Sequence, residues 1–203
     1  MTDDDRSMRD RMLAGDLYLA DDPVLTEERR RAMDLLEAFN ASRASDAEGR
    51  RRLLADLLGA WGAGSEIRSP FFCDYGYQTR VGSGTFANFG LVALDVGRID
   101  VGDGVQIGPH VQLLTATHPL DARLRRAGWE AAEPITIRDN VWLGGGVIVC
   151  PGVTIGENSV VGAGSVVIRD VAPDSLAVGS PARVVRALDG DRASFRARPT
   201  SPG

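Results

Sequence analysis

The chain has 203 residues, of which 43% are hydrophobic and 25% are charged, and its formal net charge is −5. Its 28 acidic residues outnumber the 23 basic ones, so the composition excludes a broad positive surface for nucleic acid. No apolar run approaches the roughly 20 residues of a membrane span, and the acidic N-terminus lacks a secretory signal, so we expect a cytoplasmic protein that does not enter a membrane. Two cysteines and two histidines are too few for a disulfide framework or a structural zinc site, and we expect no bound metal.

Residues 5–62 are predicted to form a helical segment. Thr26 has the hydroxyl of an N-cap, and Ser45 with a glutamate three residues later fits a capping box, so we expect helices to begin at both positions. Gly59 is expected to end the second of these helices, and a shorter helix is expected around residues 8–14. The helices carry apolar stripes, which indicate either a cap over the following core or a role in substrate binding.

In residues 63–188, an aliphatic residue recurs every six positions. A small or apolar residue follows each one four positions later, and the even spacing places both on the same face of an extended chain. Between them lies a residue type that readily turns the chain. Each hexad therefore predicts one short strand and one bend, and the stacked hexads predict a mainly β fold, a parallel β-helix. The longest register of aliphatic residues is Ile137, Leu143, Val149, Ile155, Val161 and Val167. The corresponding bends are Asn140, Gly146, Gly152, Asn158, Gly164 and Asp170.

Three segments interrupt the period. A phase slip of two residues near 95–100 suggests a bulge or a small excursion. Residues 118–134 are charged and have no sustained hexads, so we expect them to form a loop extruded from the β-helix, of the kind that is usually functional or disordered. Residues 189–203 are rich in Arg, Ser, Pro and Gly and are expected to form a flexible tail.

His118 is the strongest candidate for a catalytic base. It stands where the repeat ends and the extruded loop begins, and Pro119 restricts its backbone to an extended conformation. A neutral imidazole in this place could take a proton from an attacking hydroxyl, although it could equally cap the loop by hydrogen bonding. His110 occupies a turn position of the β-helix, and we expect it to be structural.

Several short motifs resemble the maltose and galactoside O-acetyltransferases. The resemblance covers residues 8–188 and includes the N-terminal helices. The motifs are Ala-Gly-Asp-Leu-Tyr at 14–18, Phe-Ala-Asn-Phe at 86–89, Ala-Thr-His-Pro at 116–119, Asn-Val-Trp-Leu-Gly-Gly at 140–145, Pro-Gly-Val-Thr-Ile-Gly at 151–156 and Gly-Ser-Pro-Ala-Arg at 179–183. The hexads themselves are common to all left-handed β-helix proteins and specify only the fold.

The resemblance implies a left-handed β-helix assembled as a homotrimer, with active sites between subunits and acetyl-CoA as co-substrate rather than as a permanently bound cofactor. It makes His118 the base that deprotonates the acceptor hydroxyl. Asn88 matches an asparagine that contacts the acceptor and stabilises the transition state, although without the family it would read as a turn residue. The N–H of Gly145 matches a donor to the oxyanion of the tetrahedral intermediate.

The resemblance also suggests how coenzyme A would be held. Arg169, Arg183 and Arg186 match basic or phosphate-contacting positions, and the alternative is that they are solvated charges at the end of the β-helix. Ala163 and Ile168 match contact positions through backbone groups. Trp142 could pack against the pantetheine arm, or in the core or a trimer contact.

The resemblance is weaker on the acceptor side. Where the galactoside enzymes have an aspartate that binds the sugar, this chain has Ala20, followed by Asp21 and Asp22. Asp22 is therefore a candidate replacement, with Asp21 as the alternative; a third alternative is that the acceptor differs. Asp74 and Asp95 match other acceptor-side positions and could accept hydrogen bonds from sugar hydroxyls, although Asp95 could instead cap the turn at the phase slip.

The expected reaction is acetyl transfer from acetyl-CoA to a hydroxyl of a sugar or glycoside. An amino sugar, an antibiotic or another small acceptor is the alternative with the same chemistry, and a catalytically silent β-helix scaffold is a less favoured alternative. A zinc enzyme of the carbonic anhydrase type is disfavoured, because it needs three converging histidines and this chain has two.

Overall fold

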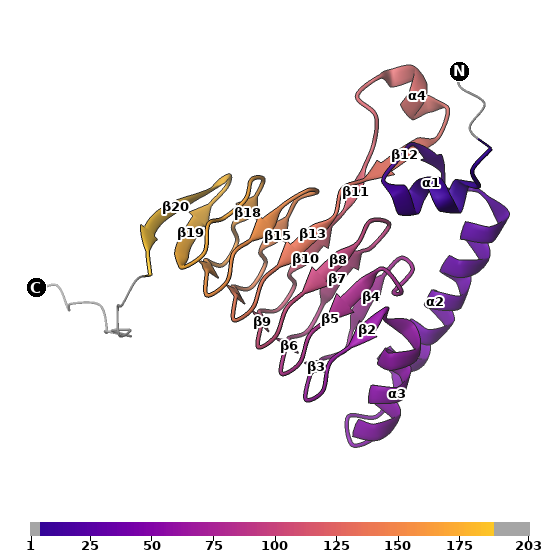
Figure 1. The fold of residues 1–203 in the computed structure, drawn as a ribbon. Helices are drawn as coiled ribbons and strands as arrows, with labels where there is room; N and C mark the ends of the chain where they lie inside the picture. The colour runs from indigo at the N-terminus through magenta and orange to yellow at the C-terminus, as the bar shows by residue number, and fades with distance from the viewer. Residues whose placement is uncertain (1–4, 189–203) are drawn as a thin grey trace, which may run out of the picture.

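The computed structural model describes residues 5–188. They form a triangular prism of stacked coils, with helices packed at the N-terminal end and one loop projecting from the side (Figure 1). The expected tail at residues 189–203 lies outside the described residues. Among the described residues, no helix combines the length and apolar composition that crossing a membrane requires.

The prism has three faces, and within each face the strands of successive coils pair in parallel. The first face contains β4 (Phe71–Cys73), β7 (Leu91–Leu94), β10 (Gln112–Leu114), β15 (Ile148–Val149) and β18 (Val166–Val167). The second contains β2 (Ala60–Trp61), β5 (Thr79–Val81), β8 (Ile99–Val101), β13 (Ile135–Ile137) and β16 (Thr154–Ile155). The third contains β3 (Glu66–Ile67), β6 (Phe86–Ala87), β9 (Gln106–Ile107), β14 (Trp142–Leu143), β17 (Val160–Val161) and β19 (Ser175–Gly179), closed by antiparallel β20 (Ala182–Ala187). The expected fold, a mainly β parallel β-helix with an N-terminal helical segment, is confirmed.

Two edges of the prism matter for the site. At the loop edge, the chain turns from the first face to the second, and the extruded loop leaves from this edge after β10. At the groove edge, the chain turns from the third face to the first through residues 88–90, 108–110, 144–146 and 162–164. Because the coils stack in register, residues at equivalent turns lie one above another along an edge.

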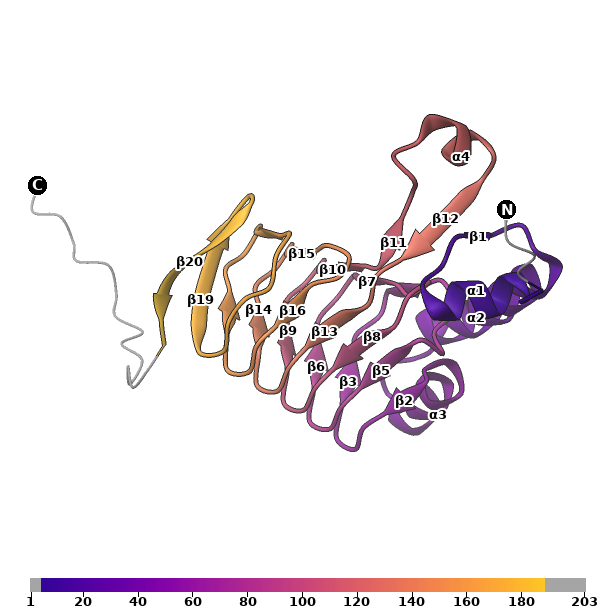
Figure 2. The ribbon, with the colours of Figure 1, turned by 45° about the horizontal axis from the view of Figure 1, so that its top comes forward.

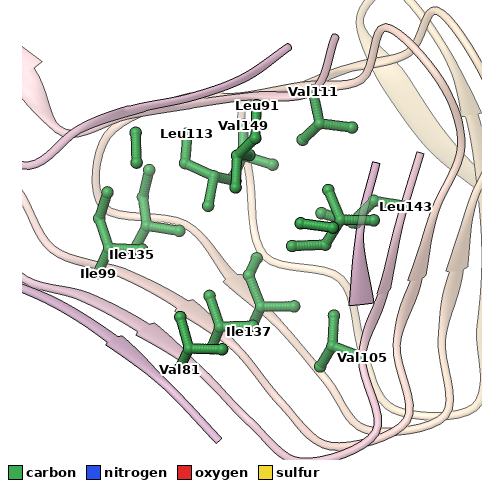
Figure 3. Close-up of a cluster of buried hydrophobic side chains, with 14 of the residues drawn as sticks. Val81, Leu91, Ile99, Val105, Val111, Leu113, Ile135, Ile137, Leu143 and Val149 are labelled. Atoms are coloured by element: carbon green, nitrogen blue, oxygen red, sulfur yellow. The ribbon is translucent and has the colours of Figure 1, made fainter. Parts of the chain in front are cut away.

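The predicted inward positions form the core. The anchors from Ile137 to Val167 are each at most 1% exposed, and the second inward positions of the same hexads are buried as well. Figure 3 shows how side chains from different coils, among them Val81, Ile135 and Ile137, meet inside the prism. The predicted bends have positive φ at Asn140, Gly146, Gly152, Asn158 and Gly164. Asp170 does not, and its carboxylate instead accepts the N–H of Thr154 at 2.7 Å.

The helical segment contains α1 (Met8–Ala14), α2 (Pro23–Ala41) and α3 (Ala47–Leu57). The short helix is confirmed, but both predicted N-caps are wrong. Asp22 caps α2 by accepting the N–H groups of Val24 and Leu25, and the proline that follows it suits the first helical turn. Asp46 caps α3 by accepting the N–H of Gly49. In each case a carboxylate, and not the hydroxyl of Thr26 or Ser45, provides the cap. Helix α3 ends at Leu57, before Gly59, and the β-helix begins at β2, three residues earlier than expected.

The extruded loop has more secondary structure than the sequence predicted. It contains α4 (Ala122–Arg126) and β12 (Trp129–Ala132). Strand β12 pairs on one side with β11 (Ala116–Thr117), which precedes the loop, and on the other with β1 (Tyr18–Leu19) from the N-terminal segment. Figure 2 shows these strands beside the N-terminal helices, away from the three faces of the prism. The charged composition concealed this small antiparallel sheet.

The stacked core predicts a strong asymmetry between the two sides of one strand. Ile137 is 1% exposed and pairs in register with Val101 and Ile155, whereas its neighbour Thr136 faces outward. Ile137→Ala is expected to lower the free energy of unfolding by about 2–5 kcal/mol, because it removes buried methyl groups and leaves a cavity. Thr136→Ala, the matched control, is expected to cost under about 1 kcal/mol. Urea denaturation measures both, and equal losses would contradict the inward stacking.

Candidate active site

A groove of about 560 Å³ runs along the third face at the groove edge. The parallel register aligns its outward-facing residues in one column, which consists of Phe86, Gln106, Trp142 and Val160. Four predicted site residues line the groove, namely Asn88, Trp142, Gly145 and Ala163. Trp142 is 51% exposed, so it does not belong to the core of the prism. Gln106 also lines the groove but is not among the predicted site residues. Like Trp142, it directly precedes an inward anchor, and this position could have identified it as a groove residue.

Unpaired hydrogen-bond donors project from the groove edge. Within the described residues, the backbone N–H groups of Gly145 and Ala163 have no acceptor, while the N–H groups of the flanking turn residues bond to adjacent coils. The Oδ1 atom of Asn88 accepts the N–H of Phe89 at 2.9 Å, which leaves the side-chain NH₂ of Asn88 as a donor. These donors could stabilise a negatively charged oxygen bound in the groove.

Glycines bring the groove wall close to the neighbouring coil. A Cβ added at Gly108 would lie 2.5 Å from the backbone nitrogen of Gly145, and one added at Gly144 would lie 2.5 Å from that of Ala163. Such contacts are too short for any real side chain. Glycine at these two positions therefore lets the coils stack where the free N–H groups are presented.

His118 lies outside this groove. It is exposed and directly follows β11, on the loop edge. Ile168 and Arg169 also lie on the loop edge, at the turn after β18, and Ile168 is 46% exposed. The predicted catalytic pair is therefore divided between two edges. The predicted coenzyme A contacts Ile168 and Arg169 likewise lie on a different edge from Gly145 and Ala163.

Two of the predicted arginines come together at the C-terminal end of the prism. Arg169 and Arg183 line a small hollow of about 140 Å³ that also includes Asp170. Arg186 lies on β20, opposite Leu176 of β19. Leu176 also lines the groove. Strand β20 therefore has Arg186 beside the groove and Arg183 at the hollow.

Asp95 has a structural role in this fold. Its carboxylate is 0% exposed, and it accepts the N–H groups of Asp74 and Tyr75 and the hydroxyl of Thr79, at 2.9–3.1 Å. Burial raises the pKa of Asp95, and these hydrogen bonds act in the opposite direction. Both oxygens of Asp95 hold the turn between β4 and β5, and a role of Asp95 in binding an acceptor remains a prediction.

Asp74 has a different environment on the same loop edge. Together with Arg29, Met33 and Phe72, it lines a second groove, of about 760 Å³, between α2 and β4. Its side chain makes no hydrogen bond within the described residues. Burial, followed by the nearby charge of Asp95, raises the pKa of Asp74 to about 6. Asp74 and His118 thus share an edge.

Asp22 is partly committed to the fold. Its Oδ1 accepts both N–H groups of the α2 cap, and its Oδ2 takes no part in that cap. The side chains of Tyr18 and Glu130 meet between β1 and β12, and no motif in the sequence indicates a role for this pair. Their pairing across 112 residues of sequence left no local signal.

Comparison with known proteins agrees with this architecture. The sequence matches the maltose acetyltransferase hexapeptide capping motif over residues 11–62 and the bacterial transferase hexapeptide repeats over residues 134–169. Galactoside O-acetyltransferase of Escherichia coli strain K12 is 38% identical over 182 residues, which are 90% of this chain and 90% of that protein.

Two solved structures are similar over nearly their whole length. A maltose O-acetyltransferase from Clostridium difficile 630 has a TM-score of 0.90 and 43% identity, with 91% of this chain and 98% of that chain covered. A hexapeptide-repeat acetyltransferase from Vibrio cholerae O1 biovar eltor, complexed with acetyl-CoA, has a TM-score of 0.84 and 42% identity, with 90% and 99% covered. The helical segment, the hexapeptide prism and the identity over almost the full length agree, and this chain belongs to the maltose and galactoside O-acetyltransferase family.

Proposed function

We propose that this protein transfers an acetyl group from acetyl-CoA to a hydroxyl of a sugar or glycoside, with His118 as the general base. The observation that carries the proposal is the set of unpaired donors on Asn88 and Gly145 in an open groove. Such donors suit the oxyanion that forms when a hydroxyl attacks a thioester. The solved Vibrio cholerae relative, which is 42% identical, was complexed with acetyl-CoA.

In the proposed reaction, the imidazole of His118 takes the proton of the acceptor hydroxyl as its oxygen attacks the thioester carbonyl carbon. The carbonyl electron pair moves onto oxygen, and the N–H of Gly145 and the side-chain NH₂ of Asn88 stabilise the resulting oxyanion. When the tetrahedral intermediate collapses, the carbon–sulfur bond breaks and the sulfur of coenzyme A receives the proton from His118. The products are the acetyl ester and free coenzyme A.

A homotrimer would complete this site. His118 and Asn88 occupy different edges of one rigid prism, so they face different directions within a single chain. A threefold arrangement that sets the loop edge of one subunit against the groove edge of the next unites them. The same contact joins Ile168 and Arg169 with Trp142, Gly145 and Ala163 around one coenzyme A.

Charged side chains are proposed to hold the two substrates, with arginines at coenzyme A and aspartates at the acceptor. Arg169, Arg183 and Arg186 stand where a fork of donors could hold the phosphates of coenzyme A. Asp74, and Oδ2 of Asp22, are the carboxylate groups proposed to bind the acceptor. The cytoplasmic location expected from the sequence remains a prediction.

His118→Ala is expected to lower kcat by about a hundredfold or more, because it removes the general base. Coenzyme A binding, measured by calorimetry, is expected to be retained. His110→Asn is the matched control, since His110 has a φ of 57° in its turn and asparagine tolerates that conformation. Thiol release from acetyl-CoA reports turnover, and unchanged kcat in His118→Ala would remove the mechanism.

Mixed assemblies test whether each site spans two subunits. His118→Ala and Asn88→Ala chains are each expected to be almost inactive. Unfolding and refolding an equal mixture is expected to restore about a quarter of the wild-type activity, because a quarter of the edge contacts in random threefold assemblies then pair two intact residues. No recovery in correctly assembled mixtures would place both residues in a site within one chain.

Asp74→Asn is expected to raise the KM for a methyl glycoside acceptor about tenfold at pH 7.5, because a charged hydrogen-bond acceptor is lost. Since the pKa of Asp74 is raised to about 6, wild-type acceptor KM is also expected to rise as the pH falls through 6 and the carboxylate is protonated. The variant lacks this group, so its acceptor KM should stay nearly level from pH 7.5 to 5. A parallel rise in both proteins would exclude Asp74 from acceptor binding.

A further inference from the structure

The residue before His118 belongs to a small sheet that lies outside the prism. In this sheet, β12 is the central strand, with β11 on one side and β1 on the other. The register pairs Thr117 of β11 with Ala131, and Leu19 of β1 with Trp129. An isolated two-stranded hairpin is at best marginally stable in water, so β11 and β12 depend on a third strand. That third strand comes from the N-terminal segment.

Continued past β11, the register would place His118 in a row with two other side chains. The structure pairs Glu130 with Tyr18, and the pairing of β11 with β12 ends at Thr117. Continued by one residue, the same register would set His118 opposite Glu130. Directly opposed residues in antiparallel strands point to the same side of the sheet. Tyr18 and Ala132 lie on this side and are buried against the second hydrophobic cluster. Glu130 and Tyr18 therefore share one face, and the continued register would put His118 on that face beside Glu130.

A hydrogen bond joins two members of this row. The hydroxyl of Tyr18 donates to Oε2 of Glu130 at 3.0 Å, and Tyr18 is 0% exposed. Burial, then the charge of Glu130, raises the pKa of Tyr18, so the hydroxyl keeps its proton and remains a donor at physiological pH. The bond fixes the central strand of the sheet to a buried, immobile side chain of the N-terminal segment.

We propose that Tyr18 and Glu130 are positioning residues for His118, and that the N-terminal helical segment acts in catalysis through this hydrogen bond. The inference rests on the proposed role of His118 as the base. Tyr18 is held in the cluster beneath α1 and α2, Glu130 is bonded to it, and the β11–β12 pairing transmits their position to His118. A general base displaced by even about 1 Å can lose a large part of its rate advantage.

The chain offers a matched control in a second tyrosine–glutamate bond. The hydroxyl of Tyr77 donates to Oε2 of Glu28 at 2.6 Å, and Glu28 also binds Arg9 at 2.7 Å. This bond likewise ties the helical segment to the β-helix and is also partly buried. However, it joins α2 to the turn between β4 and β5, and neither of its residues belongs to β1, β11 or β12.

The experiment compares Tyr18→Phe with Tyr77→Phe, each of which removes one hydroxyl. Both variants are expected to melt at similarly reduced temperatures. Tyr18→Phe is expected to lower kcat about tenfold with the KM for acetyl-CoA changed less than about twofold, because the base is misplaced while the coenzyme site is intact. Tyr77→Phe is expected to keep the wild-type kcat. Equal kcat values in the two variants would overturn the proposal.

Conservative rescue provides the second measurement. Glu130→Gln retains an oxygen that can accept the Tyr18 hydroxyl and is expected to keep most of the wild-type kcat, whereas Glu130→Ala is expected to match Tyr18→Phe. An equal loss in Gln and Ala variants would overturn the hydrogen-bond route. If Glu130→Ala does not fold, the comparison of kcat between Tyr18→Phe and Tyr77→Phe tests the proposal. Full activity in His118→Ala would instead refute the proposed function. If His118→Ala is inactive and Tyr18→Phe keeps the wild-type kcat, only this inference is refuted.

Discussion

Parallel pairing between successive coils is the constraint on which the rest of this structure depends. Each coil must lie over the one before it at a spacing of about 4.8 Å, so each place in the hexad becomes a column along the prism. Inside, the columns are aliphatic and almost fully buried. At the groove edge, the close approach of the coils requires glycine at Gly108 and Gly144, directly against the free N–H groups of Gly145 and Ala163 in the neighbouring coil. One packing rule thus produces both the core and the groove.

A rigid solenoid also separates its functional groups. Residues on different edges cannot approach one another, because the filled core between them holds the three faces apart. His118 and Asn88, and likewise Arg169 and Gly145, are divided in this way. The proposed association of prisms would bring these groups together, since each subunit could present one half of the site on either edge without any change in its own fold.

Where the repeat is interrupted, carboxylates accept backbone N–H groups. Asp22, Asp46 and Asp95 each accept backbone N–H groups at places where regular pairing begins, ends or slips. Unpaired buried donors are costly, so carboxylates at such places serve the fold first. The side chain of Asp74 makes no such bond within the described residues, and it lines a groove, whereas Asp95, for which the sequence also allowed a role as a turn cap, is fully buried.

The sequence by itself determined the β-helix, its inward residues, most of its bends and the place where the extruded loop leaves, because a period of six fixes which side chains share a face regardless of distant contacts. It also determined the family resemblance through short contiguous motifs. Only the tertiary structure decided which carboxylates cap helices, that Asp95 is buried, that Trp142 faces a groove, and that the proposed catalytic residues His118 and Asn88 lie on separate edges. It alone revealed the Tyr18–Glu130 bond, because that contact joins strands 112 residues apart and depends on the fold of everything between them.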